Sequence, residues 1–237
     1  MIHARNASEW TGPTGNNTWL LVGREPALVD AGVGHPDHLA DIQRALDGAA
    51  LARVFITHGH PDHVGGLPAL RARWPKLEVI GFLARSGGSL PAGDTTFRMM
   101  PTPGHAPDHV CFFDEQSGDL YCGDLARIGG SVVIPASKGG SLREYLASLE
   151  AVRTLAPRRL LPGHGPIIED PIALIDEYIA HRGLRDRQIV EAIASGARTT
   201  EEIVDRVYIG LSASLKGAAA DTVTAHLQKL REDGRVG

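Results

Sequence analysis

One segment, Thr57–Gly66, places three histidines and an aspartate within six consecutive positions. These four residues are His58, His60, Asp62 and His63. The segment directly follows the apolar run Val54–Ile56, which predicts a buried strand leading into a loop. A helix is expected to leave the loop over Leu67–Trp74. Any fold for this chain must therefore hold a cluster of polar, metal-binding side chains at the end of a buried strand.

The side chains of this cluster suit a metal ion. Imidazole nitrogens and carboxylate oxygens are ligands that zinc, iron and manganese accept. Alternate residues of an extended segment face the same side, so His58 and His60 are expected to point one way. Asp62 and His63, beyond the turn at Pro61, are expected to point another way, which allows two adjacent ions. The alternative, surface histidines in a polar loop, does not account for four such side chains after a buried strand.

The run from His58 to His63 resembles the H-x-H-x-D-H signature of the metallo-β-lactamase fold superfamily. Members of that superfamily complete the site with a histidine, an aspartate and a histidine further along the chain. This sequence offers His105, Asp124 and His164 in that order, each just after a strand-like segment. The resemblance covers roughly residues 15 to 170 and implies an α/β fold of four αββα layers.

The resemblance also implies how the site is arranged. It assigns His58, His60 and His105 to one divalent ion, and Asp62, His63 and His164 to a second. Asp124 is expected to bridge the two ions, which we expect to be zinc, with manganese or iron as alternatives. A hydroxide that bridges the metals would attack the substrate. Asp62 and Asp124 are the expected catalytic residues, with Asp62 orienting the hydroxide or relaying a proton.

Other polar residues are placed near this site by the order of the chain. Asp30 is expected either to hold a ligand histidine by its free N–H or to face water. His109 is better placed for a supporting hydrogen bond than for ligation. Arg127 and Lys138 would meet a substrate phosphate or carboxylate, or would simply be solvated. The segment Ser86–Ser89 is expected to form a mobile edge of the site.

Two further features have simpler interpretations than their residues suggest. The run His35–His38 looks like a metal cluster, but Asp37 is expected to cap a helix over Leu39–Leu46, with the histidines in solvent. Cys111 and Cys122 lie on two strand-like runs that form a hairpin if Phe113 pairs with Leu120. We expect two buried thiols rather than a disulfide.

The pattern changes from alternating strands and helices to helices alone near Pro171. We therefore expect a catalytic domain over residues 1–170 and a small helical domain over residues 171–237. Thr199–Glu202 is a capping box, and the last predicted helix, with Leu230 on its core side, resembles the winged-helix modules. The whole arrangement resembles the beta-lactamase-like protein 2 group, which is associated with cleavage of single-stranded RNA.

Composition restricts the partners and the compartment. The 237 residues carry a formal net charge of −4, and the helical region shows no block of cations to follow a nucleic-acid backbone. A module that packs, closes the site or forms a homodimer is therefore an alternative to one that grips RNA. The N-terminus lacks the apolar core of a signal peptide, so we expect a cytoplasmic protein with no membrane partner. Defence against β-lactams, which requires export, is poorly supported.

These observations predict a metal-dependent hydrolase with two metal ions, of the beta-lactamase-like protein 2 type. An endoribonuclease acting on single-stranded RNA is the first hypothesis for its activity. The main competitor is a hydrolase of small esters, thioesters or lactones, similar to glyoxalase II. Two further classes remain: an iron-dependent persulfide dioxygenase, and a non-catalytic regulator that binds nucleic acid.

Overall fold

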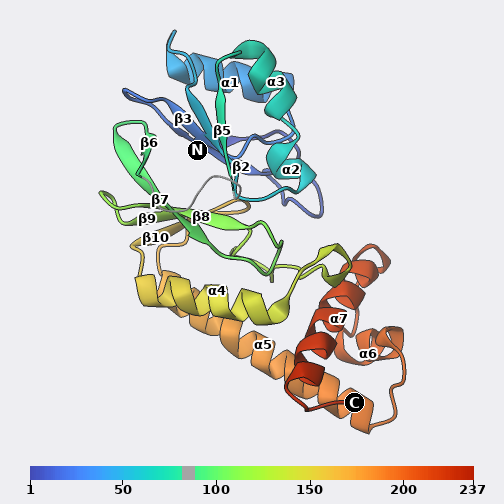
Figure 1. Ribbon diagram of the computed structural model, residues 1–237. Helices are drawn as coiled ribbons and strands as arrows, with labels where there is room; N and C mark the ends of the chain where they lie inside the picture. Colours follow the sequence, from blue (N-terminus) through green and yellow to red (C-terminus); the bar gives the residue numbers. More distant parts are fainter. Residues whose placement is uncertain (82–88) are drawn as a thin grey trace.

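The computed structural model describes residues 1–81 and 89–237. Two five-stranded sheets lie face to face, and helices cover the outer face of each, which gives the four αββα layers predicted from the sequence (Figure 1). The expected mobile edge at Ser86–Ser89 lies, except for Ser89, outside the described residues.

The first sheet contains the N-terminal strands in sequential order. Its members are β1 (Ile2–His3), β2 (Asn17–Leu21), β3 (Ala27–Val29), β4 (Arg53–Phe55) and β5 (Glu78–Ile80). Strands β1 to β3 pair antiparallel, whereas β3, β4 and β5 pair parallel. Helices α1 (Pro36–Leu46) and α3 (Leu67–Arg73) cover the outer face, and the short α2 (Pro61–Val64) precedes α3. Ile42 and Leu70 pack against Leu28 and Val54 in this outer layer.

The second sheet has the order β10-β9-β8-β7-β6. Its strands are β6 (Leu90–Ala92), β7 (Thr95–Pro101), β8 (Val110–Asp114), β9 (Asp119–Gly123) and β10 (Arg159–Pro162). All neighbours pair antiparallel except β9 and β10, which are parallel. Helices α4 (Leu142–Leu155) and α5 (Pro171–Ala194) pack on its outer face (Figure 1). Ser141 caps α4, accepting a hydrogen bond from the Glu144 N–H.

Aromatic side chains fill the space between the sheets. The Phe55 ring lies 5.1 Å from both Phe97 and Phe112, and Trp19 meets Tyr121 edge to face at 6.1 Å. Burial of such rings is the main source of stability for a layered domain. This core holds the two sheets together and thereby fixes the loops at the carboxyl ends of β4, β9 and β10 next to one another.

Beyond the sheets, α6 (Thr200–Val207) and α7 (Lys216–Glu232) pack around the far end of α5 (Figure 1). We call this the helical module, residues 186–237. Its core contains Ile189, Ile203, Val223 and Leu230, the last on the inner side of its helix as predicted. The Thr199 hydroxyl accepts from the Glu202 N–H, so the predicted cap of α6 is present.

The prediction that Asp37 caps the first long helix is wrong. Helix α1 begins at Pro36, and His35 is its cap because its Nδ1 accepts from the Asp37 N–H at 3.2 Å. Proline suits the first helical position, where no N–H is needed, and this moves the start ahead of Asp37. His38 is also not in solvent: it is fully buried and hydrogen-bonded to Thr18.

The expected hairpin and the expected thiols are both present. Phe113 pairs with Leu120 across β8 and β9, and Cys111 and Cys122 are buried, free cysteines. Burial raises the pKa of Cys111 to about 12, so the thiol stays protonated and unreactive. Within residues 1–81 and 89–237, no helix combines the length and the apolar character needed to span a membrane.

Candidate metal centre

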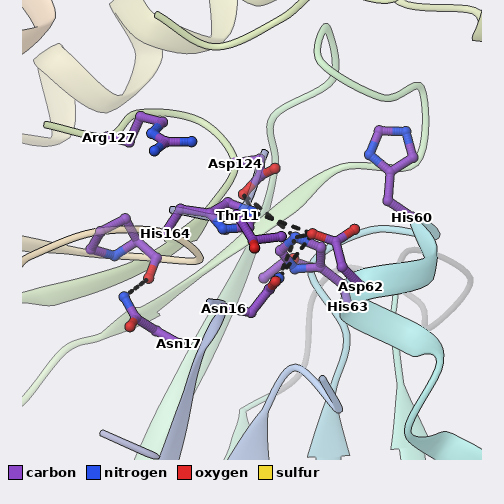
Figure 2. Close-up of polar contacts among 12 residues, drawn as sticks. Thr11, Asn16, Asn17, His60, Asp62, His63, Asp124, Arg127 and His164 are labelled. Atoms are coloured by element: carbon purple, nitrogen blue, oxygen red, sulfur yellow. Dashed lines mark hydrogen bonds and ion pairs between the residues drawn. The ribbon is translucent and has the colours of Figure 1, made fainter. Parts of the chain in front are cut away.

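The loops at the strand ends bring all seven sequence-predicted ligands together. Potential ligand atoms lie within 4.8 Å of one another in three overlapping sets: His58, His60 and His105; His58, His63 and Asp124; and Asp62, His63 and His164. Figure 2 shows the carboxylates of Asp62 and Asp124 at the middle of the group, with His60 on one side and His164 on the other. The sets share His58 and His63, so the side chains form one continuous centre.

In the first set, three imidazole nitrogens converge. His60 Nδ1 lies 2.9 Å from His58 Nε2 and 2.9 Å from His105 Nε2. His105 Nδ1 donates to the carbonyl of Val133 at 2.7 Å, which leaves a lone pair on its Nε2. One proton on His60 can serve at most one of these contacts. A cation between the three nitrogens would satisfy all of them.

The protonation of His58 follows from its neighbours. The Thr57 hydroxyl donates to the Asp30 carboxylate at 3.0 Å, so it accepts from His58 Nδ1 at 3.1 Å. His58 Nε2 therefore also presents a lone pair to the centre. Burial lowers the pKa of His58 well below its ordinary value and lowers that of His105 as well. Neutral imidazoles are the form that binds a metal.

The second set combines imidazoles with carboxylates. His164 Nε2 lies 3.3 Å from Asp62 Oδ2 and 3.3 Å from Asp124 Oδ1. Burial alone would lower the pKa of His164, but the charge of Asp124 and the close approach of both carboxylates outweigh it and raise the pKa to about 9. The set therefore favours a positive charge at this point, which a proton or a metal ion can supply.

Asp124 faces both sets. Its Oδ1 lies 3.5 Å from His63 Nε2, and its Oδ2 lies 3.6 Å from His105 Nε2. Asp124 Oδ1 is buried and accepts no hydrogen bond from the described residues. A buried carboxylate oxygen without a donor is costly unless a cation compensates it. The residues present therefore fit divalent metal ions.

Asp30 holds one of the histidines of the centre in place. It has a positive φ of 61°, and its Oδ2 accepts from His63 Nδ1 at 2.7 Å. This contact fixes His63 with its Nε2 toward the carboxylates. The alternative that Asp30 faces water is wrong, because its side chain is only 3% exposed. A carboxylate behind a metal-binding histidine raises the basicity of that ligand.

Asn16 is a site residue that the sequence reasoning missed. Its Nδ2 donates to Asp62 Oδ2 at 3.0 Å and lies 3.3 Å from His63 Nε2 (Figure 2). Asn17 beside it holds the backbone around His164, since Nδ2 donates to the carbonyl of Gly165 at 2.7 Å. The sequence signal that could have indicated these two residues is the pair of adjacent asparagines at the start of a buried strand.

His109 has the supporting position expected for it. Its Nε2 accepts from the Asp124 N–H at 3.1 Å, and its Nδ1 contacts the Thr102 hydroxyl at 2.9 Å. Burial lowers the pKa of His109 to about 3, so the ring is neutral. His109 thereby fixes the backbone of Asp124.

The segment after Asp124, residues 125–135, is held by the long helix α5. The Tyr178 hydroxyl accepts from the Arg127 N–H at 3.2 Å and donates to the carbonyl of Gly130 at 2.9 Å. The buried Arg182 donates to the carbonyl of Val132. The next residue, Val133, supplies the carbonyl that orients His105. The orientation of His105 thus depends on a helix that the sequence analysis placed in the C-terminal domain.

A cleft of about 650 Å³ opens onto the centre. Its floor contains His60, Asp62, Asp124 and His164, and Arg127 and Lys138 both line it. The opposite wall comes from the helical module and contributes Tyr208, Leu211, Leu215, Ala218 and Ala219. The cleft therefore combines a polar floor with an apolar wall, which is typical of a small-molecule site.

Two family models match the chain. The metallo-beta-lactamase superfamily matches residues 11–81 and 76–164, and the beta-lactamase associated winged helix domain matches residues 199–237. A beta-lactamase-like protein 2 homolog of Drosophila melanogaster is 31% identical over 94% of this chain and 84% of its own length.

Two further similarities extend this picture. An atrochrysone carboxyl ACP thioesterase of Aspergillus chevalieri is 32% identical and covers 82% of this chain and 68% of its own length. The protein TTHA1623, solved in a di-iron-bound form, has 28% identity and a TM-score of 0.56 over 70% of this chain and 95% of that chain.

Proposed function

Because the chain belongs to the metallo-beta-lactamase superfamily as a hydrolase with an associated winged helix domain, we propose that it cleaves small thioesters or esters with two divalent metal ions. The observation that carries the proposal is the convergence of seven ligand side chains beneath a cleft with an apolar wall. The catalytic domain is proposed to span residues 1–170 and the helical domain residues 171–237, where α5 begins.

We assign the ligands as two sets joined by one bridge. His58, His60 and His105 would hold the first ion, and Asp62, His63 and His164 would hold the second. Asp124 would serve both, an assignment supported by its two oxygens, which face His63 and His105 respectively. Imidazole with carboxylate suits zinc, and also iron or manganese. The di-iron form of TTHA1623 supports a site for two ions.

Divalent ions held there would supply a water of lowered pKa and compensate negative charge that develops on the substrate. The residues of this chain orient the water and accept its proton. Asp62, held by Asn16 at 3.0 Å, has a carboxylate aimed at the centre and accepts or relays the proton of the attacking water. Burial by itself raises the pKa of Asp62, but hydrogen bonds from His164 and Asn16 and the charge of His63 lower it below its ordinary value. Asp62 therefore remains ionised, which is the form that can bind a cation.

The lining of the cleft favours a small acyl substrate over a polymer. Arg127 and Lys138 supply positive charge, but Glu9 and Asp221 line the same cleft and oppose it. A groove for single-stranded nucleic acid needs a continuous positive track, which these opposed charges do not supply. The thioesterase name of the Aspergillus chevalieri relative supports the acyl assignment.

Cleavage of single-stranded RNA is the second candidate. The similarity to beta-lactamase-like protein 2 homologues and the presence of Arg127 and Lys138 beside the centre support it. The complete second ligand set, Asp62, His63 and His164, favours a hydrolase over a dioxygenase with one iron.

Parallel assays distinguish these candidates. Zinc-, manganese- and iron-loaded protein is given a panel of acyl thioesters and esters and, separately, labelled single-stranded RNA. We expect metal-dependent thioester or ester hydrolysis that is lost in His60→Ala and retained in His181→Ala, a histidine on α5 outside the ligand sets. RNA cleavage with the same dependence on His60, and no acyl hydrolysis, would replace the first proposal with the second.

A further inference from the structure

The wall of the cleft opposite the metal centre is built by the helical module. Four of its residues, which we call the helical-module wall, line the cleft: Tyr208, Leu211, Leu215 and Ala218. They come from the segment that joins α6 to α7 and from the first turn of α7. All four are half-buried, so each presents part of its surface to the cleft.

The helical-module wall is fixed against the floor by contacts on several sides. The Arg185 guanidinium lies 4.2 Å from the Tyr208 ring centroid and donates to the carbonyl of Val207 at 3.0 Å. The Ser137 hydroxyl donates to Asp221 at 2.9 Å, and the Ser212 hydroxyl to Glu9 at 3.4 Å. These contacts join the helical module to both rims of the cleft. The wall is therefore attached by side-chain contacts to other residues that line the site.

The chemistry of the wall specifies what it can receive. Tyr208, Leu211 and Leu215 offer apolar surface at the cleft, whereas Ile209 beside them is 91% exposed and does not line it. Apolar surface facing a cleft gains free energy when an apolar group covers it. A phosphodiester backbone gains nothing there and meets Glu9 and Asp221 on the rim.

We propose that the helical-module wall is a subsite for the acyl chain of the substrate, so that the C-terminal module sets chain-length specificity. The inference rests on the proposed thioester or ester hydrolysis. With a thioester, the oxygen of water bonds to the carbonyl carbon, the carbon–sulfur bond breaks, and the thiol leaves with the proton. The carbonyl lies over the floor between His60 and His164, while the acyl chain runs along the wall.

Binding of the product carboxylates tests this subsite without turnover. Calorimetry on zinc-loaded protein follows the dissociation constants of the straight-chain series from butanoate to decanoate. Each methylene that enters the subsite tightens binding by up to about fourfold. Leu215→Ser is the diagnostic variant because Leu215 is half-buried at the cleft. Leu211→Ala, from a different point of the wall, is made in parallel.

Ile209→Ser is the matched control, since it removes an apolar side chain from the same segment but not from the cleft. We expect the gain per methylene to persist in Ile209→Ser and to fall in both wall variants, with butanoate bound equally by all four proteins. An unchanged gain per methylene in Leu215→Ser and Leu211→Ala, or no gain in the wild type, overturns the subsite.

The same chain-length series, as acyl thioesters, separates the subsite from the proposed function. Turnover without dependence on chain length would retain the hydrolase and reject the subsite. A chain-length series in binding with no turnover of any thioester or ester would retain the acyl subsite and reject the proposed reaction.

Discussion

Two buried polar clusters in this molecule are completed in different ways. In the helical module, Asp186 accepts from His226 Nδ1 at 2.6 Å and from Lys229 Nζ at 2.9 Å, so its negative charge is compensated within the chain. In the metal centre, His60 faces two lone pairs, and Asp124 Oδ1 accepts no hydrogen bond from the described residues. We call the first cluster the closed cluster because its carboxylate charge is compensated within the chain, although His226 Nε2 has no partner among the described residues. The second needs a cation and is available for chemistry.

The largest expected effect comes from removing the bridging carboxylate. Asp124→Asn should lower kcat by about a hundredfold to a thousandfold, the range seen when a group that stabilises transition-state charge is lost. It should also lose most of the metal-dependent increase in stability, which is about 2.7 kcal/mol at a metal concentration a hundredfold above the Kd. Hydrolysis assays and urea unfolding with and without zinc measure both. Retention of the zinc-dependent increase would contradict the bridging role.

Substitution in the closed cluster should lower stability by the same amount with and without zinc, in contrast to substitution of Asp124. Asp186→Asn should lower the free energy of unfolding by about 3 kcal/mol, because it leaves His226 and Lys229 without their partner. The loss should be equal with and without zinc, since this cluster holds no ion. Urea unfolding in both conditions measures it. A zinc-dependent difference would show that the two clusters are not independent.

Acid should weaken the closed cluster in a defined direction. Burial raises the pKa of Asp186, but the hydrogen bonds from His226 and Lys229 outweigh it and hold the pKa below its ordinary value. A group with a depressed folded-state pKa stabilises the protein above its unfolded-state pKa, about 4, and loses this contribution as the pH falls through the folded value. The stability advantage of wild type over Asp186→Asn should be complete above about pH 5 and shrink below it. An advantage that grew on acidification would contradict this sign.

A smaller effect, on metal affinity, is expected from substitution of Asp30, which contacts a ligand histidine and not a metal ion. Asp30→Asn should weaken metal binding by about tenfold to a hundredfold, because Asp30 orients His63 without touching the ion. Competition with a chelating dye measures the affinity, and the exposed Asp47→Asn serves as the control. Equal affinities in the two variants would remove Asp30 from the account.

The smallest effect should come from the exposed ion pairs that join the helical module to α4. Arg143 contacts Glu232 and Asp233, but its side chain is 51% exposed. Such pairs contribute about 1 kcal/mol or less and weaken with salt. Arg143→Ala should therefore change the free energy of unfolding far less than Asp186→Asn. A loss as large as that of Asp186→Asn would mean that the surface pairs hold the module.

The sequence predicted best where structure is local. The strand before Thr57 and the run His58–His63 lie within ten residues, so their pattern already indicates a strand, a loop and a ligand cluster. The helical cap at Thr199 follows from a similarly short pattern, whereas the four-layer fold was expected from the resemblance to a known superfamily. Asp37 was misplaced as a cap because one proline decides where that helix begins.

The rest of the site depends on residues that meet only in the folded chain. Asn16 reaches Asp62 across 46 residues, and Arg182 reaches Val132 across 50. No periodicity or spacing in the sequence marks these pairs. The helical-module wall is of the same kind, since Tyr208 and Leu215 reach the cleft only because α5 carries them there.

The metal content of the purified protein tests the central claim most directly. Elemental analysis after loading with zinc and removal of free metal should give two ions per chain. His60→Ala and His164→Ala, which belong to different ligand sets, should each reduce the content toward one. A single ion per chain in the wild type, or two ions that survive both substitutions, would contradict the paired centre.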